Sequence, residues 1–115
     1  DFGELQEDWE AHWDDIKDVD LSGKIVAIYG MGDQLGYAEW FQDAVGMLHH
    51  AIAPQDCIRI GFWPTTGYDF IASKAATDDG QWFYGLALDE ENQYDQTDQR
   101  LNQWLTQLMN ELIAL

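Results

Sequence analysis

The stretch "KIVAIYGMGDQLGYAEWF", residues 24–41, joins an apolar run to a glycine-rich turn and then to a helical pattern. Residues 24–30 are almost uninterruptedly apolar and rich in β-branched side chains, which is typical of a strand covered on both faces. Apolar residues at 37–52 recur at helical spacing until Pro54, and "CIRIGFW" at 57–63 reads as a second strand. This strand–helix–strand order predicts two parallel, neighbouring strands.

The flanking segments extend this α/β pattern. We expect a helix over residues 4–16, a third strand-like run in "QWFYGLAL" at 81–88 with a bulge at Gly85, and a last helix that is capped by Thr97 or Asp98. Residues 64–81 are polar and longer than an ordinary connection, which usually needs about 4–6 residues. That length indicates an insertion or a functional loop.

Composition favours one acidic domain that spans residues 1–115. The chain is 46% apolar and contains 22 acidic against 5 basic residues, a formal net charge of −17. Nine of the acids lie in residues 1–20 and five in residues 89–98. Nucleic acid and anionic lipid are therefore poor partners, whereas a basic protein would be attracted. The alternative is a solvated surface that only aids solubility.

The sequence also predicts a cytoplasmic protein. It has no run of eighteen apolar residues and no leader pattern, so we expect neither a membrane span nor a signal peptide. The one cysteine, Cys57, excludes an internal disulfide, and we expect it to act as a small buried hydrophobe.

The turn after the first strand is the candidate binding site. Gly30, Gly32 and Gly36 allow close approach of a ligand to the backbone or a positive φ, and Asp33 can accept a hydrogen bond from an imide-like N–H. Tyr37 offers a flat face for stacking. These groups suit a planar heteroaromatic ring. The alternative is an ordinary strand-to-helix turn with Asp33 as a local cap. The phosphate-binding patterns G-x-G-x-x-G and Walker A are both absent.

Four segments together resemble the carboxyl-terminal part of a long-chain flavodoxin of the cyanobacterial or algal type. They are "FGELQEDWE", "GKIVAIYGMGDQLGYAEWFQDAVG", "GFWPTTGYDFIASKA" and "GLALDEENQYDQTDQRLNQW". The resemblance covers essentially the whole chain, including the inserted segment of long-chain members, and about the last two thirds of the family's doubly wound fold.

The resemblance implies an electron-transfer protein rather than an enzyme, with FMN as cofactor. Tyr37 is similar to the tyrosine stacked on the outer face of the isoalloxazine, Asp33 to the acid near its N3–H, and Asp89 to an acid near the flavin. Backbone contacts to the pyrimidine edge would come from the loop residues Gly30, Met31, Gly32, Gln34 and Gly36. The implied partners are basic redox proteins such as a ferredoxin–NADP reductase or photosystem I.

The departures from the family pattern lead to three further expectations. No Ser/Thr-rich phosphate loop is encoded, Asp1 stands where an asparagine is common, and Met31 stands where a threonine is common. We therefore expect weak FMN binding or none. We also expect a truncated flavodoxin-like sheet with helices on both faces, whose strand 24–30 lacks one neighbour and pairs with a second chain. Alternatively, another polypeptide supplies the missing part.

The sequence gives weaker evidence for any other binding site. His49 and His50 point about 100° apart on a helix, a poor metal pair, and we expect both at the surface or its boundary. Trp9, Trp13, Trp63 and Trp104 are expected to fill the core.

Two alternatives to a flavin protein stay open. One is an FMN-free module that acts by self-association or partner binding, and the other is a fragment made to study folding.

Overall fold

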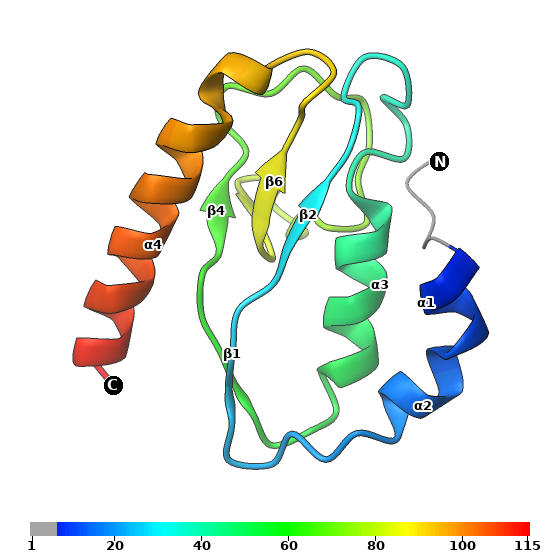
Figure 1. The fold of residues 1–115 in the computed structure, drawn as a ribbon, viewed down its shortest axis with the longest axis vertical. Coiled ribbons are helices and arrows are strands. Elements are labelled where there is room, and N and C mark those ends of the chain that lie inside the picture. Colours follow the sequence, from blue (N-terminus) through cyan, green and yellow to red (C-terminus); the bar gives the residue numbers. More distant parts are fainter. Residues whose placement is uncertain (1–6) are drawn as a thin grey trace.

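Short strands run through the middle of the molecule, and helices lie on both sides of them (Figure 1). The computed structural model describes residues 7–115, with side chains from Trp9 onward. The helices are α1 (Glu7–Ala11), α2 (Trp13–Lys17), α3 (Asp43–Ile52), the 3₁₀ turn η1 (Tyr94–Gln96) and α4 (Thr97–Ile113). The strands are β1 (Ile25–Val26), β2 (Tyr29–Met31), β3 (Ile58–Arg59), β4 (Trp63–Pro64), β5 (Trp82–Phe83) and β6 (Leu86–Leu88).

The predicted strand at 24–30 exists, but it changes neighbour half-way. β1 pairs in parallel with β3, and β2 pairs in parallel with β6. The switch falls at Ile28: Ile60 N donates to Val26 O at 3.0 Å, and the next rung is Leu86 N to Ile28 O, also at 3.0 Å. The second strand is shorter than predicted, because Gly61 has a φ of +84° and turns the chain away from β1. Strand–helix–strand pairing of parallel neighbours is confirmed for β1, α3 and β3.

One edge of this central strand has no neighbour among residues 7–115. The carbonyls of Lys24, Val26 and Ile28 accept from β3 and β6, so both neighbours lie at the same edge. The backbone groups of the odd-numbered residues alternate to the other edge, because successive residues of a strand point in opposite directions. Tyr29 and Met31, on this strand, are 61% and 60% exposed. The strand formed by β1 and β2 therefore lies at an edge of the sheet within the described chain.

Helices cover both faces, as predicted. Ala87 of β6 faces α3, where it packs with Phe41, Val45 and Phe83. Its neighbours Leu86 and Leu88 face the other way and pack on Trp104 of α4. Figure 1 shows α3 and α4 on opposite sides of the strands, with α1 and α2 outside α3. The two small cores therefore follow from the alternation of side chains along one buried strand.

Three helix predictions need correction. The helix expected from residue 37 begins only at Asp43, because Gln42 adopts a left-handed φ of 61° and the preceding residues form turns. The first helix is interrupted at His12, and its predicted residues 4–6 lie outside the described residues. The last helix, α4, keeps its predicted 3.6-residue pattern to Ile113, but its N-cap is Gln96 and makes no side-chain capping bond, so the predicted cap at Thr97 or Asp98 is wrong.

The long polar segment after β4 is packed rather than free. β4 and β5 close it as an antiparallel pair, and Tyr84 N donates to Ala75 O at 2.8 Å. Ala75 is fully buried against α3, and Gly46 of α3 touches the backbone of Lys74 and Ala75. Residues 64–81 thus form part of the α3 face of the core.

The predictions of burial for the tryptophans and for Cys57 are only partly right. Trp104 is buried, Trp13 and Trp63 are half-buried, and Trp9 is largely exposed on α1, so Trp9 is not a core residue. Cys57 is half-buried.

Within residues 7–115, no helix combines the length and apolarity that crossing a membrane requires.

Candidate ligand-binding turn

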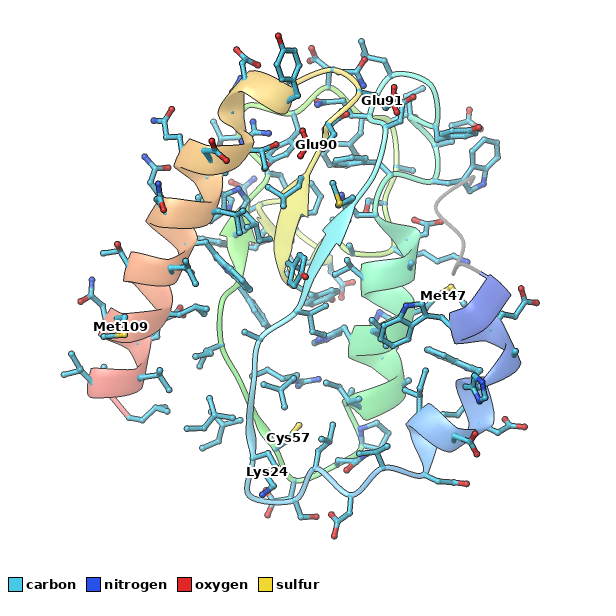
Figure 2. All side chains as sticks on the ribbon, in the orientation of Figure 1. Lys24, Met47, Cys57, Glu90, Glu91 and Met109 are labelled. Carbon is cyan, nitrogen blue, oxygen red and sulfur yellow. The ribbon has the colours of Figure 1, made fainter. Side chains whose placement is uncertain are left out.

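The glycine-rich turn lies where β2 and β6 end side by side. Residues 32–42 follow the carboxyl end of β2, and the acidic segment that begins at Asp89 follows the carboxyl end of the parallel strand β6. Figure 2 shows Glu90 and Glu91 at this end of the molecule, opposite Lys24 and Cys57. Ligands of open parallel sheets bind at this end, because the loops there lead from strands into helices.

Asp33 is held by three donors, all on one carboxylate oxygen. Its Oδ1 accepts from Gly36 N at 2.7 Å, Leu35 N at 3.2 Å and Asn92 Nδ2 at 2.7 Å. The Gly36 N–H and the Asn92 amide lower the pKa of Asp33 below its ordinary value. Asp33 is therefore charged at neutral pH, and the other oxygen, Oδ2, accepts no hydrogen bond from the described residues.

Asp89 is buried next to the turn and accepts hydrogen bonds from several of its neighbours. Its side chain is 0% exposed, and its Oδ2 accepts from Gln34 N, Gln34 Nε2 and Asn92 Nδ2 at 2.7–3.0 Å. Its Oδ1 accepts from the backbone N–H groups of Glu91 and Asn92. Burial raises the pKa of Asp89, but these donors outweigh burial and lower it overall. The carboxylate faces protein donors rather than solvent.

Gln34 and Asn92 join separate parts of the chain. The Oε1 atom of Gln34 accepts from Asp69 N at 2.5 Å, which connects the turn to the packed segment 64–81. Asn92 donates to both Asp33 and Asp89. Three segments, which are distant in sequence, are thus tied at one end of the sheet.

The glycines of the turn serve internal packing. None of Gly30, Gly32 and Gly36 has a positive φ, so that part of the prediction is wrong. A Cβ at Gly30 would meet Val45, one at Gly36 would meet the Asp33 carboxylate, and one at Gly32 would lie 3.1 Å from the Phe41 ring. The close approach that requires glycine is therefore made by the protein's own side chains.

Two predicted site residues flank the turn. Met31 ends β2 with its side chain 60% exposed, on the same face as Leu86 and Leu88. Tyr37 is half-buried at the far end of the turn, and its N–H donates to Asp33 O at 3.0 Å. In the described part of the chain, no three His, Cys, Asp or Glu residues converge as a metal site would require.

A family model described as flavodoxin matches residues 1–104. The chain belongs to the flavodoxin family. It is 57% identical over 112 residues to flavodoxin 2 of Escherichia coli K12, which covers 97% of this chain and 65% of that protein. It is 51% identical over 110 residues to the flavodoxin of Nostoc sp. PCC 7120, covering 96% of this chain and 64% of the relative.

The flavodoxin fold is also found by structural comparison. The structure of Fusobacterium nucleatum flavodoxin bound to flavin mononucleotide matches with a TM-score of 0.88 at 30% identity. That match covers 96% of this chain and 65% of the other. The predicted α/β fold class is confirmed, and the chain spans slightly less than two thirds of the length of these flavodoxins.

Gln42 is the residue of this flavodoxin turn that the sequence did not reveal. It is 3% exposed with a left-handed backbone, and its Nε2 donates to Leu88 O at 3.1 Å, the carbonyl that also accepts from Gly32 N. Its Oε1 is buried and accepts no hydrogen bond from the described residues. Strained backbone and an unpaired buried acceptor cluster at functional sites. The periodicity placed Gln42 inside a helix, so no local pattern pointed to it.

Proposed function

We propose that this chain is a flavodoxin-type electron carrier whose glycine-rich turn holds the ring of FMN. The main support is Asp33, which is fixed in place by Gly36, Leu35 and Asn92 through Oδ1 while Oδ2 accepts no bond from the described residues. A carboxylate oxygen suits the imide N–H of an isoalloxazine. The F. nucleatum relative, of similar fold, is bound to flavin mononucleotide.

The residues present fit the ring better than the phosphate. We propose that the ring contacts the backbone of the turn and the face of Tyr37. The residues proposed to contact it are Gly30, Met31, Gly32, Asp33, Gln34, Gly36 and Tyr37. Asp89 belongs to the site as a positioning residue, since its oxygens are occupied by Gln34 and Asn92. We add Gln42 as a second positioning residue, because its Nε2 donates to Leu88 O, the carbonyl that also accepts from Gly32 N. Within residues 7–115, neither a Walker turn nor another glycine-rich phosphate motif is present.

FMN, when bound, supplies one-electron chemistry, and this chain supplies binding, orientation and electrostatics. Asp33 orients the ring edge, Tyr37 covers one face, and no residue makes or breaks a bond to a substrate. The protein is thus proposed to be a carrier rather than an enzyme. Because its charge is −17, reduction adds negative charge in a negative environment, which disfavours the reduced flavin.

The proposed partners are basic redox proteins, which in this family include a ferredoxin–NADP reductase or photosystem I. Exposed acids lie at the same end as the turn: Glu39, Glu90 and Glu91 are on the loops, and Asp95 is on η1. Opposite charges steer such partners toward the ring edge. A cytoplasmic location agrees with these partners.

Flavin titration tests the proposal. We expect both FMN and riboflavin to lose fluorescence on binding and to bind with similar affinity, because the described residues offer no phosphate site. Tyr37→Leu should weaken both flavins about three- to tenfold, the equivalent of one aromatic contact of about 0.5–1.5 kcal/mol. Tyr94→Leu is the matched control, since Tyr94 is exposed on η1. Unchanged fluorescence at high micromolar flavin would reject the flavin site.

A second function is proposed on one observation: one edge of β1 and β2 has no neighbour among residues 7–115. It is an FMN-free module, or a fragment suited to folding studies, that associates with itself through strand 24–30 or with a polypeptide that completes the sheet. The exposed residues Ile25, Tyr29 and Met31 lie on this strand. We expect dimers by sedimentation at micromolar concentration and monomers for Met31→Lys. A monomeric wild-type chain would contradict self-association.

We further propose that residues 1–115 act as one domain of the long-chain type. The support is the packed excursion at 64–81, whose Ala75 is buried against α3 and whose Asp69 N–H reaches Gln34. Deleting residues 66–72 should lower both the unfolding free energy and flavin affinity. An intact fold with unchanged affinity after this deletion would show that the segment is dispensable.

A further inference from the structure

A groove of about 700 Å³ lies at the edge of the sheet, away from the glycine-rich turn. Its lining comes from the segment 59–64, from Trp82 of β5, from Gln107 and Glu111 of α4 and from residues 114–115, which follow α4. Figure 1 shows this half of α4 at the end of the molecule opposite the loop that follows β2. Small-molecule sites usually measure about 300–1,000 Å³, so the size suits a small ligand.

The backbone at the floor of the groove is already satisfied by α4. Glu111 Oε2 accepts from Gly61 N at 2.9 Å, and Gln107 Nε2 donates to Phe62 O at 2.7 Å. Trp104 Nε1 donates to Gly61 O at 2.8 Å. A β-strand from a partner would need these same backbone groups, so strand addition is disfavoured here. The surface that remains is mostly apolar and aromatic.

Among the described residues that line the groove, Arg59 is the one cationic side chain. It forms no ion pair with the acids described in residues 9–115, and its Nη1 lies 3.5 Å from His49 Nδ1. Burial lowers the pKa of His49 to about 4, with Arg59 and His50 adding to the effect, so this imidazole is neutral at pH 7. No described acid neutralises the guanidinium, which is therefore available to bind an anion even though the chain has a net charge of −17.

We propose that the groove binds a planar aromatic monocarboxylate, with its carboxylate on Arg59 and its ring against Phe62, Pro64 and Trp82. A guanidinium pairs with a carboxylate in a bidentate geometry, and aromatic walls suit a flat ring. Glu111 also lines the groove, and its negative charge disfavours a second anionic group on the ligand. This site goes beyond flavin binding and uses none of the residues of the turn.

Calorimetric titration with 2-naphthoate and with uncharged 2-naphthalenemethanol tests this site. We expect naphthoate to bind more tightly, and Arg59→Gln to weaken naphthoate about tenfold or more without changing the alcohol. Arg59→Lys should give an intermediate affinity, because a lysine keeps the charge and loses the planar fork. Lys74→Gln, which removes an exposed positive charge outside the groove, should leave the affinity unchanged.

A second measurement locates the bound carboxylate. Neutralising Arg59 removes one of the causes that lower the pKa of His49, so NMR titration should show this pKa rising with naphthoate in the wild type but not in Arg59→Gln. Excess riboflavin should not displace the naphthoate. Equal naphthoate affinity in wild type and Arg59→Gln, a static His49 pKa, or displacement by riboflavin would overturn the proposal.

Discussion

A single amide at Asn92 holds two carboxylates near each other without a cation. Its Nδ2 lies 2.7 Å from Asp33 Oδ1 and 2.9 Å from Asp89 Oδ2. The sequence singles out Asp33 as a ligand-binding acid or as a local cap of the turn, but it does not reveal the side chains that hold it. The pairing with Asp89 depends on a contact across 59 residues between Asn92 and Asp33, which no local pattern encodes.

Asn92→Asp should therefore be costly. It replaces a donor by a third carboxylate, so the unfolding free energy should fall by about 1–3 kcal/mol at pH 7, and flavin affinity should fall with it. Urea denaturation measures the first and fluorescence titration the second. Asn102→Asp adds the same charge at an exposed position of α4 and serves as control. If the two variants behave alike, Asn92 does not organise the turn.

The position of His49 differs from the prediction. The sequence predicts a position at the surface or its boundary, but His49 is 6% exposed and stacks on Tyr84 with ring centroids 3.7 Å apart. The adjacent His50 is exposed, as expected. Helical spacing shows which residues share a face, but the depth of burial depends on Tyr84 and Phe62, which come from other segments.

The buried imidazole predicts a loss of stability in acid. The pKa of His49 is about 4 in the folded chain, against an ordinary value of 6.5, so below pH 6.5 the unfolded chain binds a proton that the folded chain does not. Stability should fall as pH drops from 6.5 toward 4, by about 1–2 kcal/mol at pH 5. Urea denaturation at pH 7 and pH 5 should show a smaller loss for His49→Gln, and an undiminished loss for His50→Gln.

At the scale of elements, α3 depends on a glycine that touches backbone. A Cβ at Gly46 would collide with the carbonyl of Lys74, and a backbone carbonyl cannot rotate away as a side chain does. This contact joins α3 to the excursion 64–81 and keeps that segment in the core. The sequence predicted an insertion there, but its attachment to α3 became visible only in three dimensions.

Gly46→Ala should separate α3 from that segment. We expect a loss of about 3 kcal/mol in unfolding free energy, at the upper end for an overpacked site. Gly80→Ala is the control, because Gly80 has a φ of +72° and open space around its Cα, so only backbone strain of about 1–2 kcal/mol applies. Equal losses in the two variants, measured in urea, would mean that α3 adjusts freely.

For the whole molecule, charge is the largest single feature. A net charge of −17 on 115 residues opposes compaction, because like charges are brought closer together on folding. The described residues contain one lysine–carboxylate ion pair, Lys17 with Asp14, and one hydrogen-bonded contact of His12 with Asp15, and both are exposed. Attraction between such surface pairs offsets little of the repulsion.

Salt should therefore stabilise the chain. Raising sodium chloride from about 20 mM to about 500 mM shortens the Debye length from about 20 Å to about 4 Å and screens the repulsion. We expect a higher melting temperature, followed by circular dichroism. Potassium chloride at equal ionic strength should give the same shift if screening is the cause. A melting temperature independent of salt would contradict this account.

The sequence by itself determined the α/β order, the position of the glycine-rich turn, the existence of α4 and, through its resemblance, the flavodoxin family. These features follow from periodicity and turn chemistry, which act over a few neighbouring residues. Only the tertiary structure decided the change of strand neighbour at Ile28, the late start of α3, and the burial of Asp89, Gln42 and His49. Each of these depends on partners far along the chain, because burial and hydrogen bonding of a polar group are set by what packs over it.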